Sequence, residues 1–242
     1  MWLSTRHELK KLRPASVSID STAINPVKSA RCLGVILDDE LKLAKHVATV
    51  CRSSYYQIRQ LKHIRRYLDF DSAKTLMHSF LTSRVDYCNS LLASVPVYQT
   101  DQLHYVLNAA DPLLHRVPRF DLDLRVKIKD RLHWLRVPER VTFKACTLVY
   151  KSLHGSAPQY LAELCNPVAS DSYRRNLRTA FKNELIVPRH KLSTYRSRSF
   201  GIAGPIAWNL LPQHLRYDEL SYERFSMRLK SHLFRISYDC IA

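Results

Sequence analysis

The stretch Arg31-Cys32-Leu33-Gly34-Val35-Ile36-Leu37-Asp38 marks the point where this chain changes from β patterning to α patterning. Before it, Val17, Ile19 and Ile24 lie among Ser, Thr, Asn and Pro residues, which is typical of short strands and a turn. After it, apolar residues recur at helical spacing almost to the C-terminus. Gly34 inside the apolar run predicts a strand whose backbone approaches something closely. A buried edge strand with no further role would show the same pattern.

The length and composition predict a folded, mainly α-helical protein. The chain has 242 residues and is 46% hydrophobic, enough to build a core, and only 4 glycines argue against a barrel or sandwich of many tight turns. We expect a helical bundle preceded by a small β-hairpin or strand element. A basic, irregular C-terminal region ending in a helix completes the prediction. The corresponding parts are residues 1–39, 40–116 and 117–242.

Helix boundaries follow from caps, prolines and apolar spacing. A long helix is expected from a cap at Asp38 or Asp39 to about residue 66, because acidic residues stabilise a helix start. The alternative, a metal-binding carboxylate cluster at residues 38–40, remains open on the sequence. The other expected helices run from a cap at Asp71 to Cys88, from about residue 100 to 110 with a break or bend at Pro112, from Pro138 to Gly155, and onward from a cap at Ser221.

The net charge of the chain indicates which kinds of partner it would attract. Lys plus Arg number 38 against 21 Asp plus Glu, giving a formal net charge of +17. Such an excess favours phosphate backbones first and an anionic membrane surface second. No apolar run approaches the ~20 residues of a membrane span, and no apolar leader follows Met1. We therefore expect an intracellular protein, nuclear or cytoplasmic, that is not secreted and binds no membrane.

Residues suited to catalysis or metal binding do not form a recognisable set. The 6 cysteines are scattered without a Cys-x-x-Cys pair, which is typical of reduced thiols and argues against a zinc site. There is no glycine-rich phosphate loop, no Gly-x-Ser-x-Gly and no His-Glu-x-x-His. The sequence predicts no catalytic residue, metal, cofactor or small-molecule substrate. It leaves the oligomeric state open.

Two basic segments are candidate nucleic-acid surfaces. One is a helix that carries cations along one side, at Arg59, Lys62, Arg65 and Arg66. The other is a basic segment over residues 173–200 with interleaved aromatic residues, which offers phosphate contacts and stacking faces. Its candidate contacts are Arg174, Arg175, Arg178, Lys182, Arg196 and Arg198. Each segment could instead be a solvated basic surface without a partner.

A series of short motifs, in order and spacing, carries a family resemblance. They are Cys32-Leu33-Gly34-Val35-Ile36-Leu37-Asp38, Ser83-Arg84-Val85-Asp86-Tyr87-Cys88-Asn89-Ser90-Leu91-Leu92, Leu107-Asn108-Ala109-Ala110, Leu132-His133-Trp134-Leu135-Arg136-Val137-Pro138-Glu139-Arg140, Leu153-His154-Gly155-Ser156-Ala157-Pro158-Gln159-Tyr160-Leu161, Arg198-Ser199-Phe200 and Trp208-Asn209-Leu210-Leu211-Pro212. From residue 1 to about 236, the chain resembles the region after the catalytic centre in LINE reverse transcriptases, nearest the non-LTR retrotransposons of the jockey superfamily.

The resemblance implies roles for each part. Leu33, Gly34 and Val35 would correspond to the primer-grip strand at the edge of the palm. Residues 40–116 would be the helical thumb that holds the template–primer duplex, and the remainder the carboxy-terminal segment associated with RNA template binding. RNA or an RNA–DNA hybrid is thus the implied partner. The family's Phe/Tyr-Ala-Asp-Asp turn is absent, so the chain as given should not polymerise DNA alone.

Two segments depart from the family's pattern. Asp111 and Pro112 stand where the family continues a helix of small residues, so that helix is expected to be shortened. Residues 120–127 have drifted ahead of the Leu-His-Trp motif. Both departures are typical of a decaying transposon fragment or a mispredicted reading frame, and they leave the fold of residues 110–130 open.

Three functional hypotheses follow. The first is a non-catalytic fragment that binds nucleic acid through its thumb and basic C-terminal region. The second is the C-terminal part of an active RNA-directed DNA polymerase, if upstream sequence supplies the Ala-Asp-Asp turn. The third is a host-adopted protein-interaction module that uses apolar surface at its amino terminus, since loss of the palm should expose the apolar side of residues 1–37.

Overall fold

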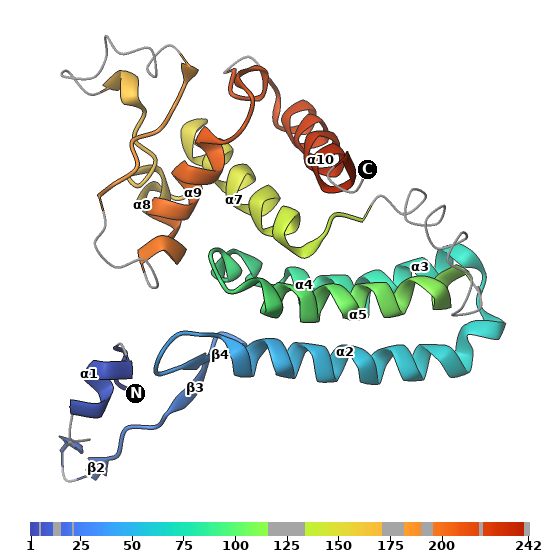
Figure 1. Cartoon of the computed structure of the whole chain (residues 1–242), viewed down its shortest axis with the longest axis horizontal. Helices are drawn as coiled ribbons and strands as arrows, with labels where there is room; N and C mark the ends of the chain where they lie inside the picture. The colour runs from blue at the N-terminus through green and yellow to red at the C-terminus, as the bar shows by residue number, and fades with distance from the viewer. Residues whose placement is uncertain are drawn as a thin grey trace.

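The computed structural model describes residues 1–4, 6–11, 16–20, 22–115, 134–170, 182–189, 196–217 and 220–239. Helices dominate these residues, and two small antiparallel strand pairs precede the main helices (Figure 1). The prediction of a mainly α-helical chain with a small N-terminal β element is therefore confirmed. The division at residues 39 and 116 stays a prediction.

The amino-terminal part contains a short helix α1 (Arg6–Lys11) and two hairpins. The first hairpin pairs β1 (Val17–Ile19) with β2 (Thr22–Ile24), and the second pairs β3 (Ser29–Cys32) with β4 (Val35–Asp38). Leu33 and Gly34 connect β3 to β4 with φ angles of 45° and 84°. Positive φ at both central residues is the geometry of a two-residue hairpin turn, which favours glycine. Gly34 thus lies in a turn, not inside a strand as its apolar neighbours suggested.

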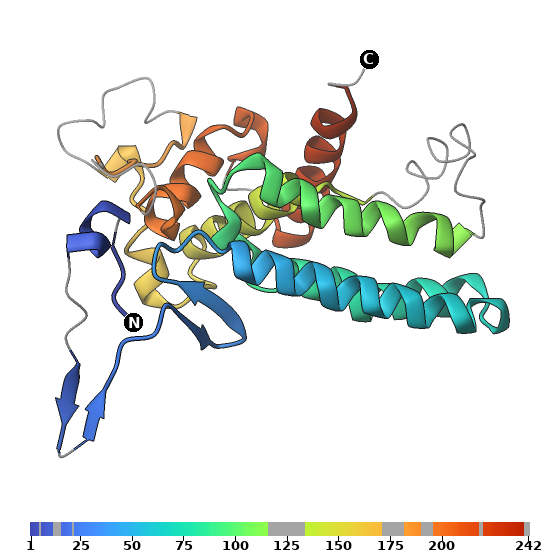
Figure 2. The same ribbon diagram turned by 60° about the horizontal axis from the view of Figure 1, so that its bottom comes forward.

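A helical bundle follows the second hairpin. Figures 1 and 2 show the long helix α2 running beside the helices that return along it. The elements are α2 (Ala44–Ile64), a 3-10 turn η1 (Arg65–Tyr67), α3 (Phe70–Met77), a π-helical turn η2 (His78–Thr82), α4 (Ser83–Asp86), a 3-10 turn η3 (Asn89–Leu92) and α5 (Val97–His115).

The helix starts differ from the sequence predictions by several residues. Asp38 does not cap α2 directly: its carboxylate accepts hydrogen bonds from the backbone N–H groups of Lys42 and Leu43 at 2.7 and 2.8 Å, and the helix begins at Ala44. The second helix is capped by Asp69, whose side chain accepts from Ser72 N, so the expected cap at Asp71 was wrong. In both places an acidic residue does satisfy early N–H groups, but its position is set by the turn geometry.

Pro112 does not end α5, which continues to His115. The expected shortening of this helix was therefore wrong. Leu114 is fully buried in the bundle core, and Arg65 binds the carbonyls of Leu113 and Leu114. These contacts hold the last turn in spite of the missing proline N–H.

The carboxy-terminal half is also helical where it is described. The elements are α7 (Val137–Leu153), α8 (Gln159–Ala162), η4 (Val168–Ser170), η6 (Arg196–Arg198), α9 (Phe200–Asn209), η7 (Gln213–Leu215) and α10 (Tyr222–Asp239). The expected helix from Pro138 toward Gly155 is confirmed, with the proline in the first turn. Ser221 precedes α10 and accepts from Arg224 N at 3.4 Å, which agrees with its predicted role.

Helix α7 connects the two halves through their cores. Near its start, Val137 and Val141 pack with β4, α2 and α5, whereas Val149 and Tyr150 pack with α9 and α10. In the core between α7, α9 and α10, the Tyr150 and Phe225 rings are stacked with centroids 4.5 Å apart. The ring centroids of Trp208 and Phe225 are 5.7 Å apart. One continuous helix therefore holds the bundle and the C-terminal helices together.

The amino-terminal hairpins expose much of their apolar surface. All residues of β1 and β2 are exposed, Ile19 by 58%, and Leu33 at the tip of the second hairpin is 86% exposed. Trp2 and Leu3 are exposed as well. In Figure 2 the first hairpin projects away from the helices. The expectation that residues 1–37 present an apolar side is confirmed for the described residues up to Leu33, whereas Val35 is buried.

Candidate nucleic-acid interface

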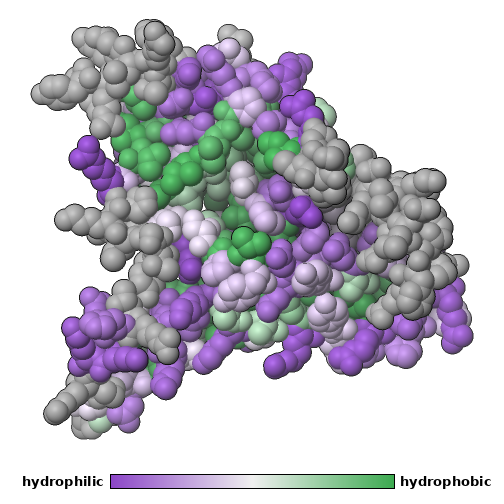
Figure 3. Space-filling model, in the orientation of Figure 1, coloured by the Kyte–Doolittle hydropathy of each residue, from purple (hydrophilic) through white to green (hydrophobic). Residues whose placement is uncertain are grey.

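Five cations form a line along the exposed side of α2. Lys45, Arg52 and Arg59 in α2 and Arg66 in η1 recur every seven residues. Seven residues of an α-helix fall only about 20° short of two full turns, so these side chains lie on one side. All are exposed. We call this set, which is Lys45, Arg52, Arg59, Lys62 and Arg66, the α2 cationic stripe. In Figure 3 hydrophilic surface follows the edge formed by α2, while hydrophobic surface gathers over α8 and α9.

The α2 cationic stripe has little local countercharge. No acidic residue occurs between Leu41 and Leu68. No ion pair among the described residues involves Arg52, Arg59 or Lys62. The positive potential along this side of the helix is therefore available to an external anion.

Tyrosines interleave with these cations. Tyr56 is 53% exposed and lies one turn from both Arg52 and Arg59, while Tyr67 carries the Arg66 guanidinium 4.9 Å above its ring. Alternating cations and aromatic rings bind phosphate and stack on bases. The sequence analysis singled out neither Lys45, Arg52 nor Tyr56 as site residues, although their seven- and four-residue spacings were visible.

Arg65 does not belong to this surface, so its prediction as a nucleic-acid contact was wrong. It lies four residues after buried Leu61 and is itself only 7% exposed. Its guanidinium donates to the backbone carbonyls of Leu68, Leu113 and Leu114 at 2.7, 3.1 and 2.6 Å. Two of these bonds satisfy carbonyls at the end of α5, and all three hold the guanidinium in the interior, away from a phosphate.

The second predicted surface is described only in part. Lys182 is exposed, and Arg196 belongs to η6. Arg198 is half-buried and donates to the carbonyl of Leu41, so it ties η6 to the turn before α2. Arg174, Arg175 and Arg178 lie outside the described residues. The structure thus brings Arg198 close to the start of the bundle and leaves the other contacts of this segment as predictions.

The residues predicted as primer-grip-like form the tip and return strand of the second hairpin. Leu33 points outward, Gly34 is in the turn, and Val35 is buried, with only 3% of its surface exposed. The Tyr87 hydroxyl donates to Leu33 O at 2.7 Å, and a Cβ added to Gly34 would lie 3.2 Å from Tyr87 Cε1. The close approach expected at Gly34 is therefore present, but the approaching group is a tyrosine of this chain.

The hairpin is anchored to α2. The bonds of Asp38 to Lys42 and Leu43 fix the turn between β4 and the helix. Ile36 N lies 3.4 Å from Nδ1 of His46, and burial, followed by the charge of Arg31, lowers the pKa of His46. A neutral imidazole can accept this hydrogen bond. The hairpin tip and the α2 cationic stripe are consequently held in a fixed relation.

The described ranges contain no cluster of side chains suited to a metal ion. No three His, Cys, Asp or Glu side chains there gather closely enough to hold a metal ion. Burial raises the pKa of the Cys146 thiol to about 12, which keeps this cysteine protonated and unreactive at neutral pH. Across the same residues, no helix has the length and apolar character needed to cross a membrane.

Mutation of the two neighbouring arginines should affect the stability of the fold to very different extents. Arg65→Ala should lower the free energy of unfolding by about 3 kcal/mol, because buried carbonyls lose a charged donor. Arg66→Ala should change it by less than about 1 kcal/mol, because its side chain is exposed. Urea denaturation followed by circular dichroism measures both. Equal losses for the two variants would contradict the assignment of Arg65 to the interior and Arg66 to the surface.

Comparisons with known proteins add no relative. No protein-family model, no curated protein and no solved structure matches this chain. The likeness to LINE reverse transcriptases therefore rests on the sequence motifs alone, and the interface is argued from its own geometry.

Proposed function

We propose that this chain binds RNA or an RNA–DNA hybrid along the α2 cationic stripe, as the thumb-like and C-terminal part of a LINE-type reverse transcriptase without the catalytic palm. The observation that carries the proposal is the cationic, tyrosine-containing side of α2. The helix has 21 residues and is about 31 Å long. A line of cations of that length can contact several phosphates of a nucleic-acid backbone.

The motif series supports the same proposal from a different direction. It assigns residues 40–116 to a thumb that holds the template–primer duplex, and α2 is the longest helix of that segment. The basic residues Arg174, Arg175, Arg178, Lys182 and Arg196 would extend contact to single-stranded template. We expect such a chain to act inside the cell, in the nucleus or cytoplasm. Joined to a segment with the Ala-Asp-Asp turn, the same surface would serve an active polymerase.

The binding proposal predicts a specific salt dependence. In fluorescence anisotropy with a labelled RNA–DNA hybrid, log affinity should fall linearly with log salt concentration. The combined variant Arg52→Ala, Arg59→Ala, Lys62→Ala and Arg66→Ala should weaken binding at least about tenfold at low salt and reduce the slope by about 3 to 4, because each lost phosphate contact removes about one unit. The combined variant Arg174→Ala, Arg175→Ala and Arg178→Ala tests the C-terminal segment with single-stranded RNA in the same way.

A matched control removes equal charge elsewhere. Lys10, Lys11, Lys74 and Lys144 are exposed lysines outside the α2 cationic stripe. Changing these four to alanine gives the same net charge as the stripe variant, and it should leave most of the hybrid affinity and slope intact. Equal losses in the two variants would mean that net charge alone drives binding, and the proposed interface would fail.

The exposed amino-terminal hairpin favours a second candidate function, self-association. Val17 and Ile24 are cross-strand partners, and Ile19 lies on the same face as Val17, so one face of this hairpin is apolar. An isolated two-stranded hairpin is only marginally stable in water, and pairing with a second copy would cover this face. A host-adopted interaction module would use this surface.

Self-association and phosphate-driven assembly respond oppositely to salt. Apolar contact between copies should persist or strengthen at high salt, because screening reduces the repulsion between chains of charge +17. Ile19→Lys with Ile24→Lys should abolish it in sedimentation velocity, whereas Ser18→Lys with Ala23→Lys, on the opposite hairpin face, should not. A monomer at every salt concentration would rule out this second function.

A further inference from the structure

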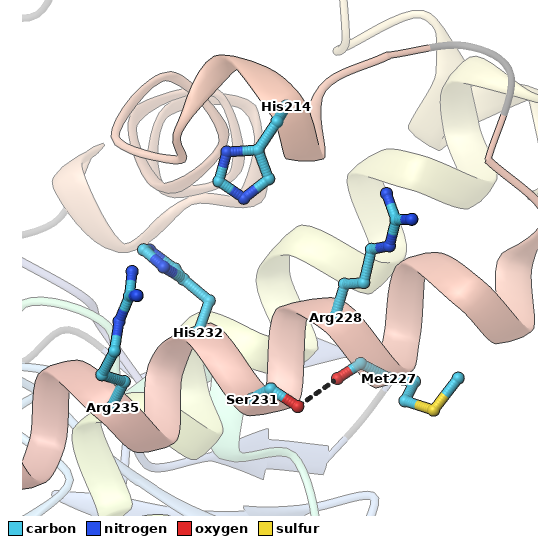
Figure 4. Close-up of a pocket in the computed structure, with 6 residues that line it drawn as sticks. All are labelled: His214, Met227, Arg228, Ser231, His232 and Arg235. Atoms are coloured by element: carbon cyan, nitrogen blue, oxygen red, sulfur yellow. Dashed lines mark hydrogen bonds between the residues drawn. The ribbon is translucent and has the colours of Figure 1, made fainter.

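A second cluster of cations lies far from α2 along the chain, in a groove between η7 and α10. The groove holds about 540 Å³. Figure 4 shows His214 extending from η7 over the space above α10, with three nitrogen-bearing side chains of the helix below it. The lining residues are His214, Met227, Arg228, Ser231, His232 and Arg235. None of them is acidic. The sequence analysis assigned no role to any of these residues.

Helical spacing explains why these side chains meet. Arg228, His232 and Arg235 are separated by four and three residues, so they share one side of α10. The buried side of the same helix is anchored by Phe225, Leu229 and other core residues. The helix is therefore fixed in rotation, which keeps this side of α10 toward the groove.

The opposite wall is held just as firmly. Leu215, next to His214, is buried in the C-terminal core, with only 1% of its surface exposed. The following residue, Arg216, is also buried, and its guanidinium lies 3.5 Å from the Glu184 carboxylate. Arg216 thus already has an acidic partner, whereas the groove side chains face one another without a carboxylate among the residues that line it.

Burial and the positive charges around the groove disfavour protonation of His232. Burial, then the charges of Arg235 and His214, lowers the pKa of His232. Nδ1 of His232 is shielded from solvent and has no hydrogen-bond partner among the described residues. The hydroxyl of Ser231 donates to Met227 O at 3.1 Å, so its proton is used within the helix. The available donors in the groove are those of arginine and histidine, which are the groups that recognise oxyanions.

We propose that the groove between η7 and α10 is a phosphate-binding site, in which Arg228 and Arg235 contact the oxyanion and His214 and His232 close over it. Arginine matches the geometry of phosphate with paired N–H donors. Along the helix the two arginines are about 10 Å apart, so the groove has room for a phosphate within a chain as well as a free one. The site does not depend on the α2 cationic stripe.

The test follows the imidazole signals of the intact protein by NMR during titration with inorganic phosphate and, separately, with a short oligouridylate. Sodium chloride at equal ionic strength provides the screening control. Phosphate should bind saturably and raise the pKa of His232 by about one unit beyond the chloride control, because a nearby anion favours the charged ring. Tighter saturation by the oligonucleotide would identify a nucleic-acid phosphodiester as the ligand, and tighter saturation by inorganic phosphate would identify a free anion.

Matched variants on one helix complete the experiment. Arg228→Ala with Arg235→Ala should abolish the shift, while Arg224→Ala with Lys230→Ala, which removes equal charge from α10 outside the groove lining, should preserve it. All four side chains are exposed, so the fold should survive, and the backbone spectrum checks this. No shift beyond chloride, or equal loss in both variants, would overturn the proposal. The variant of the α2 cationic stripe keeps all residues of the groove. If that variant shows that α2 does not bind the hybrid, phosphate binding in the groove can still be measured independently.

Discussion

The arrangement of the bundle depends on the hydrogen bonds between the buried Arg65 side chain and the end of α5. The guanidinium donates two hydrogen bonds to carbonyls in the last turn of α5, those of Leu113 and Leu114, and a third to the nearby carbonyl of Leu68. The carbonyls at a helix end have no partner within the helix, and a buried charge needs several partners, so each solves the other's requirement. Arg65 faces inward, and the helical rotation of about 100° per residue turns the next residue, Arg66, toward the exposed side. Together with buried Val47 and Leu61, this contact sets the orientation of the α2 cationic stripe.

The same rule, that an interior contact orients an exterior surface, applies to two further parts of the described structure. Asp38 fixes the turn into α2 and thereby the position of the Leu33–Gly34 tip. Phe225 and Leu229 fix α10 and so direct Arg228 and Arg235 into their groove. The excess of positive charge is thus divided into separate, oriented surfaces. Each can be tested by removing equal charge from a neighbouring position.

Much of the fold was predictable because periodicity reports burial directly. The helices of the bundle, α7, α10 with its cap at Ser221, and the β element could be predicted from residue spacing, whereas α1 and α9 were not predicted. Arg65 was misplaced because adjacent arginines look equivalent in composition, yet its four-residue distance from Leu61 does indicate the buried side. Gly204 in α9, where a Cβ would lie 3.0 Å from Val149 Cγ2, could not be predicted, because that contact joins helices distant in sequence. The groove under His214 was hidden for the same reason.

Lysine footprinting of the complex with an RNA–DNA hybrid tests the central claim most directly. The protein is acetylated with and without saturating hybrid, and the modification of each lysine is measured by mass spectrometry. The α2 interface predicts that Lys45 and Lys62 become protected, while Lys10, Lys11, Lys74 and Lys144 remain reactive. Protection spread evenly over all exposed lysines, or absent from Lys45 and Lys62, would contradict the assignment of nucleic-acid binding to α2.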